Sequence, residues 1–193
     1  MKVLISLSSF GAAETGRHGQ LWCTDLAQQA GADGVEVRGE LLRDAATELP
    51  ALAGRAAVYS SPEGLWTPQG ALDEAALARG VQAAQVLRAP RLKMSIGGFS
   101  SSSHASLHRL KALLQAAQAL APYVRYVHCK GVQRLPAKWV AVPLADSVAP
   151  WRAVLRALPA DVPHAIEYPL VGDDLVAVTR EQVAFIRAAR EAA

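Results

Sequence analysis

Apolar and polar residues alternate along this chain with two different periods. Short segments rich in Val, Ile and Leu place apolar residues at every second position, whereas longer segments rich in Ala and Leu have helical spacing. The expected strands are residues 2–7, 34–38, 56–61, 91–96, 124–130, 139–144 and 164–169, and the expected helices lie near 19–31, 44–53, 71–89, 103–120, 150–158 and 179–191. Because strands and helices alternate, the sequence predicts an α/β fold with a mostly parallel sheet, either a barrel or a doubly wound sheet.

Several of the expected strands carry charged residues between their apolar ones, so one face of each strand is apolar and the other is polar. The charged residues are Glu36, Arg38, Lys93, His128, Lys130 and Glu167. Helices cover both faces of a doubly wound sheet, where such charges would be costly. The inner face of a barrel can instead be polar near the carboxyl ends of its strands, where active sites lie.

We therefore expect a barrel in which the six charged side chains converge in one cavity at the carboxyl ends of the strands. Neighbouring cations should then favour the charged form of both carboxylates. The alternative is that some of these residues lie at strand ends in solvent or form an internal ion-pair network without a function.

Composition narrows the class of protein. The 193 residues predict a single domain, 1–193, and 51% hydrophobic with 19% charged residues is a globular balance. The net charge of +3 comes from scattered Lys and Arg, which argues against nucleic-acid binding. Two cysteines without a CxxC motif favour a reducing compartment. The first apolar run, 3–7, is too short for a secretory signal and no longer run suits a membrane span, so we expect a cytoplasmic protein.

Four segments together resemble the xylose isomerase-like TIM barrels, which include sugar and sugar-phosphate isomerases and epimerases and endonuclease IV. They are GADGVEVRGELL (31–42), VRYVHCKGVQRLPAKW (124–139), APWRAVLRALP (149–159) and VPHAIEYPLVGDD (162–174). The resemblance implies that His128 and Glu167 ligate a divalent metal such as Mn, Co, Mg or Zn. It also implies that Arg134, six residues beyond His128, binds substrate.

The chain departs from that family in length. A full barrel has eight strands and roughly 250 residues, whereas here one expected helix leads directly from strand 91–96 to strand 124–130. No Glu or Asp lies between Ile96 and His128, so the acidic ligands that the family draws from that region are absent. We therefore expect a shortened barrel of six or seven strands with a gap, covered by a loop, a helix or a dimer contact. With two ligands left, we expect weak metal binding, with Lys93 or Lys130 supplying the missing positive charge.

Two functions remain open. The first is an isomerase or epimerase acting on a small carbohydrate or its phosphate, with Glu167 as the base and His128 or a metal polarising the carbonyl. Lys93, Lys130 and Arg38 would then neutralise an anionic substrate, while Glu36, Arg134 and the loop residue Trp66 would also contact it. The second is a barrel that binds an anionic metabolite or a protein partner without turnover. The sequence does not decide whether the chain is an enzyme, and nuclease activity is disfavoured by the missing ligands.

Overall fold

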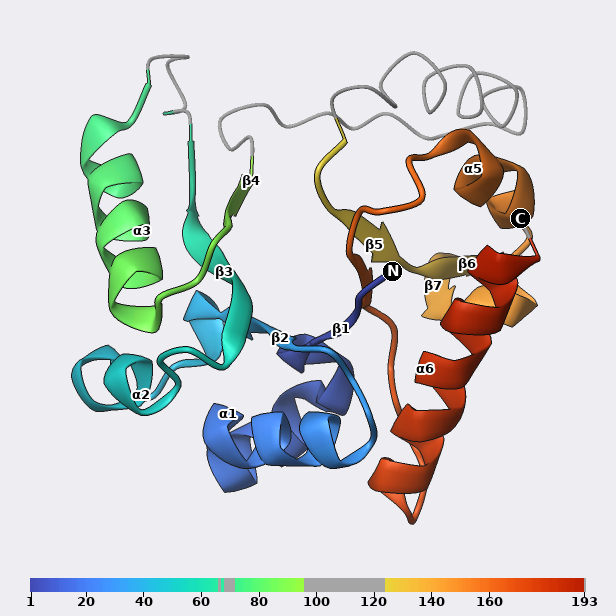
Figure 1. Cartoon of the computed structure of the whole chain (residues 1–193), viewed down its shortest axis with the longest axis horizontal. Coiled ribbons are helices and arrows are strands. Elements are labelled where there is room, and N and C mark those ends of the chain that lie inside the picture. The colour runs from blue at the N-terminus through green and yellow to red at the C-terminus, as the bar shows by residue number, and fades with distance from the viewer. Residues whose placement is uncertain (66, 68–71, 96–123, 193) are drawn as a thin grey trace.

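Six parallel strands form the main sheet of the protein. The computed structural model describes residues 1–65, 67, 72–95 and 124–192. The strands of the main sheet are β1 (Val3–Ser6), β2 (Val35–Arg38), β3 (Ala56–Gly64), β4 (Leu92–Ser95), β5 (Val127–Cys129) and β8 (His164–Ile166). They lie in the order β4-β3-β2-β1-β8-β5, and every neighbouring pair is parallel. The sheet curls into a half-barrel with helices around it (Figure 1), which confirms the expected shortened β/α barrel.

The strand order shows where the barrel is open. Strands β1 to β4 follow one another across the sheet, and β8 and β5 continue it on the other side of β1. The edge strands are therefore β4 and β5, which are consecutive in the described part of the chain. This is the place where the sequence predicts a gap. Residues 96–123, which include the expected helix 103–120, lie outside the described residues. The expected cover of the gap, as far as it comes from this segment, lies outside them too.

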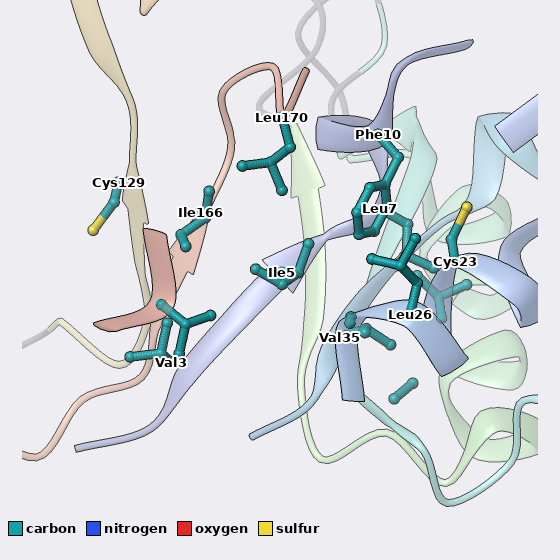
Figure 2. Packing of buried hydrophobic residues seen from close by; sticks show 14 of the residues in the cluster. Val3, Ile5, Leu7, Phe10, Cys23, Leu26, Val35, Cys129, Ile166 and Leu170 are labelled. Carbon is teal, nitrogen blue, oxygen red and sulfur yellow. The ribbon is translucent and has the colours of Figure 1, made fainter. Parts of the chain in front are cut away.

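Helices pack on the outer face of the half-barrel and bury its apolar side chains. They are α1 (Gly11–Gln29), α2 (Ala45–Ala51), α3 (Glu74–Leu87), α5 (Trp151–Ala157) and α6 (Leu175–Glu191), with short 3-10 turns at Leu7–Phe10, Gly39–Leu41 and Leu144–Asp146. Val3 and Ile5 of β1 point into the same core as Leu26 of α1, as Figure 2 shows. Ile186 of α6 belongs to that core as well. The apolar residues that alternate along each strand thus face outward, towards the helices.

Three helices begin at an aspartate that caps them. Asp44, Asp73 and Asp174 each accept a hydrogen bond from a backbone N–H in the first turn of α2, α3 and α6. The cap at Asp174 places the start of α6 at Leu175, four residues before the expected start. The first helix also begins earlier than expected, because Gly19, with φ 83°, joins two helical segments across a kink.

The expected strand 139–144 is not part of the barrel, which corrects the sequence prediction. Strand β7 (Trp139–Val142) pairs antiparallel with β6 (Gly131–Arg134) in a separate hairpin between β5 and α5. The hairpin backbones approach closely at Gly131, where a Cβ atom would lie 2.6 Å from the Val142 carbonyl oxygen. A residue with a side chain would push the two strands apart there.

The inner face of the half-barrel has an apolar base and a polar end. Leu4, Val58 and Ala165 are completely buried and pack together with Tyr126. One alternation step further along the strands, Ser6 and Glu36 are also completely buried. The polar end therefore lies at the carboxyl ends of the strands, where β/α barrels hold their sites.

In the part of the chain that the structure describes, no helix combines the length and the apolar character that crossing a membrane requires.

Candidate functional site

Six charged side chains meet at the polar end of the half-barrel, and we call them the charged cluster. They are Glu36 and Arg38 of β2, Lys93 of β4, His128 of β5, Lys130 directly after β5 and Glu167 directly after β8. The parallel register places these positions at one end of the sheet, because all six strands run in the same direction. The structure thus brings together the six residues that the alternation indicated.

His128 lies between two carboxylates. Its Nδ1 is 2.6 Å from Oε2 of Glu167, and its Nε2 is 2.8 Å from Oε2 of Glu36. A neutral imidazole has a single N–H, whereas two carboxylates require two donors. Burial by itself lowers the pKa of His128, but the hydrogen bonds to Glu167 and Glu36 outweigh burial and raise it. With a carboxylate oxygen at each ring nitrogen, both nitrogens act as donors, and this is the imidazolium form.

Glu36 is completely buried, and both of its oxygens have partners. Oε1 accepts from Ser6 Oγ at 2.8 Å, and Oε2 accepts from the Tyr126 hydroxyl at 2.9 Å as well as from His128. Burial raises the pKa of this carboxyl. The hydrogen bond and charge of His128, with the charge of Lys93, outweigh burial and lower the pKa to about 2.

Glu167 extends the pairing of β8 by one residue, because its backbone N–H donates to the Cys129 carbonyl oxygen. Its Oε1 accepts from Arg38 Nη1 at 2.9 Å. Burial raises the pKa of Glu167, but His128 and then the charges of Lys93 and Lys130 lower it to about 2. Both carboxylates are therefore ionised under all ordinary conditions.

Arg38, which lies on β2, pairs with both carboxylates, Glu36 and Glu167. Its Nη1 lies 3.2 Å from Glu36 Oε1 and 2.9 Å from Glu167 Oε1, while Nη2 pairs with Glu40 at 2.6 Å. The buried Gln20 of α1 holds the Arg38 backbone through two hydrogen bonds, of 2.9 Å to the carbonyl oxygen and 2.8 Å from the N–H. Arg38 is therefore held at its backbone by Gln20 and at its guanidinium by carboxylates.

Lys93 reaches across the open side of the half-barrel. Its Nζ lies 3.5 Å from His128 Nδ1, 3.7 Å from Glu36 Oε1 and 3.9 Å from Glu167 Oε1. Because Lys93 is on β4 and His128 is on β5, these contacts connect the two edge strands. Lys130 is more exposed and lies 4.0 Å from Glu167.

One residue expected to bind substrate lies outside the charged cluster, and another is not among the described residues. Arg134 lies in the β6–β7 hairpin, where its guanidinium is 5.5 Å from the centre of the Trp139 ring. The hairpin turns the chain away after β5, which the six-residue spacing from His128 does not show. Trp66 lies outside the described residues.

Sequence reasoning missed the neutral residues that hold the cluster. Tyr126 contacts both Glu36 and, edge to face, the ring of His128. Its position two residues before His128 on the same strand face was the available signal. Ser6 and Gln20 gave no such signal, because their partners on β2 are distant in sequence.

The donor set of Glu36, His128 and Glu167 suits a divalent ion chemically, since two carboxylates and an imidazole offer ligand atoms within 4.8 Å of one another. The surroundings suit it less well. Both ring nitrogens of His128 already face carboxylates, and Arg38 and Lys93 supply two permanent positive charges beside them. The arrangement fits an internal cation better than a metal.

Neither models of known protein families nor curated proteins match this chain. The resemblance to xylose isomerase-like barrels therefore depends on the four sequence segments quoted above. The half-barrel is compatible with it, and fold alone does not assign a function.

Proposed function

We propose that this protein is a shortened xylose isomerase-like barrel that transfers a proton next to a carbonyl group on a small carbohydrate or its phosphate. The observation that carries the proposal is the contact of Glu167 with His128 and Lys93 at the carboxyl ends of the strands. A carboxylate beside two cationic donors supplies the groups that enolisation needs.

Three residues, His128, Lys93 and Glu167, would share the steps of enolisation. The substrate carbonyl oxygen accepts hydrogen bonds from the His128 imidazolium and the Lys93 ammonium. Glu167 removes the proton from the adjacent carbon, and the electron pair of the broken C–H bond becomes part of an enediolate whose oxygen those cations stabilise. Return of the proton from Glu167 to the neighbouring carbon, with the substrate hydroxyl proton passing to the former carbonyl oxygen, gives an isomer. An epimer forms when solvent water protonates the original carbon from the opposite face and Glu167 releases its proton to solvent.

Substrate binding would also change the strength of the base. In the free protein Glu167 has a pKa of about 2, because His128, Lys93 and Lys130 surround it. Such a carboxylate is a weak base at neutral pH. When substrate oxygens take over the donors of His128 and Lys93, the pKa of Glu167 should rise towards its ordinary value.

A specific observation favours a second candidate, binding of an anionic metabolite without turnover. Both carboxylates have a pKa of about 2 and are engaged by cations, and Lys130 is exposed beside Glu167. A protein that uses only the cations would not need a base.

Exchange of substrate hydrogen with solvent tests the proposal. The protein is incubated in D2O with a panel of aldoses, ketoses and their phosphates, and deuterium at the carbon next to the carbonyl is followed by NMR. We expect incorporation with at least one compound and a loss of about 100-fold or more in Glu167→Gln. Glu181→Gln, an exposed change on α6, should leave the rate unaltered.

Binding without any exchange across the whole panel would reject proton transfer and support the second candidate. Exchange that survives in Glu167→Gln would reject the role of Glu167 as the base.

A further inference from the structure

We propose that the Lys93 ammonium occupies the position of a divalent ion among Glu36, His128 and Glu167, so that the site works without metal and replacing Lys93 creates a metal site. This inference goes beyond the proposed function, because it concerns what fills the site and holds whether or not the site catalyses a reaction.

The first support is geometric. Nζ of Lys93 lies within 4 Å of an atom of each of the three residues that form the candidate ligand set. The three ligand atoms lie within 4.8 Å of one another, so a single cation can contact all of them. The ammonium forms ion pairs with both carboxylates, whereas the protonated His128 ring is a neighbouring positive group and not an acceptor for it.

The second support is the balance of charge. The two carboxylates, Glu36 and Glu167, face three positive groups, the permanent cations Arg38 and Lys93 and the His128 imidazolium, so their charge is already more than balanced without a metal. A divalent ion would add two positive charges within a few ångströms of both cations. Repulsion of this kind is strong where the groups are shielded from water, as Glu36 is.

The third support comes from the histidine. A metal ligand needs a ring nitrogen without a proton, whereas both ring nitrogens of His128 face carboxylate oxygens, at 2.6 and 2.8 Å. An incoming ion would have to break one of these hydrogen bonds as well as displace Lys93.

Lys93 suits this role better than Lys130. Lys130 approaches only Glu167 among the three residues, at 4.0 Å, and its side chain is 47% exposed against 34% for Lys93. Lys93 is also placed by the pairing of β4 with β3, in which it lies opposite Ser60. The two lysines therefore provide a comparison within the same site.

The experiment measures metal binding directly by the full chain. Wild type, Lys93→Met, Lys93→Gln and Lys130→Met are dialysed and titrated with Co²⁺ and Mn²⁺, using calorimetry and the visible Co²⁺ spectrum. Lys138→Met, an exposed change in the hairpin, is the matched control. Circular dichroism tests whether each variant is folded. If Lys93→Met is unfolded, Lys93→Gln takes its place in the comparison.

We expect one Co²⁺ per chain in the Lys93 variants, bound on the order of 100-fold or more tighter than in wild type. Adding His128→Ala to Lys93→Met should remove this binding and its spectrum. Lys130→Met and Lys138→Met should behave as wild type or nearly so.

Two outcomes would overturn the inference. Wild type that retains one tightly bound ion after dialysis would show that Lys93 does not fill the position, and this measurement needs no variant. Folded Lys93 variants that bind no more tightly than wild type would show that the ammonium is not what excludes the ion. A protein that excludes metal as expected but transfers no proton would count against the proposed function and leave this inference standing.

Discussion

Glu36→Gln removes a charge from the most buried carboxylate of the cluster and tests whether these contacts stabilise the fold. The pKa of Glu36 falls from its ordinary 4.5 to about 2 in the folded protein. That difference corresponds to roughly 3 kcal/mol of folding free energy wherever the carboxyl is ionised in both states. We therefore expect Glu36→Gln to be less stable than wild type by about 3 kcal/mol at pH 5.5.

The pH dependence has a definite sign. Because the folded pKa is lowered, the stabilisation by Glu36 is present above pH 4.5 and disappears as the pH falls through 2. The difference between variant and wild type should shrink to less than half of that value at pH 3, where unfolded Glu36 is protonated and folded Glu36 is still mostly ionised. His128 is largely protonated at both pH values, and buried His164 is the same in both proteins, so neither obscures the comparison.

Urea unfolding followed by circular dichroism at pH 5.5 and pH 3 measures this difference. At pH 5.5 the midpoint should fall by about 1 to 2 M urea. Glu181→Gln, exposed on α6, should leave the midpoint unchanged at both pH values. A Glu36→Gln difference under about 1 kcal/mol at pH 5.5, or one that does not change between the two pH values, would refute the reasoning.

Three further predictions concern the surroundings of the cluster. Gln20→Leu removes both hydrogen bonds to the Arg38 backbone and should lower the unfolding free energy by about 1 to 3 kcal/mol in urea titrations; unchanged stability would contradict this. Cys23 and Cys129 are buried, and burial raises the pKa of Cys129 to about 12, so neither thiol should react with a disulfide reagent until urea unfolds the chain. The raised pKa of His128 stabilises the fold below pH 6.5, and this contribution is lost as pH rises through the folded value. Melting temperatures of His128→Gln should therefore lack that alkaline decrease, and an identical decrease in both proteins would exclude His128 as its cause.

The strands of the main sheet could be predicted because apolar residues recur at every second position. The place of the gap could be predicted because one expected helix joins strand 91–96 directly to strand 124–130. Lys93 and His128 were expected on one face because charges on a face covered by helices would be costly. The hairpin was not expected, since Gly131–Arg134 has no strong strand pattern of its own. The role of Arg134 was implied by the family resemblance, and its spacing from His128 did not show that it lies in the β6–β7 hairpin. Sequence also could not show that Glu36 shares one imidazole with Glu167, because that contact depends on the curvature of the sheet.

The central position of β1 has a consequence for folding during synthesis. Its two neighbours are β2, which follows closely, and β8, whose His164 pairs with Val3 across about 160 residues of chain. The ribosome therefore releases β1 long before its second neighbour exists, and until then one edge of this apolar strand has no partner in the sheet. Such edges promote association between chains. Nascent chains that stop before β8 should depend on chaperones more than the finished protein does.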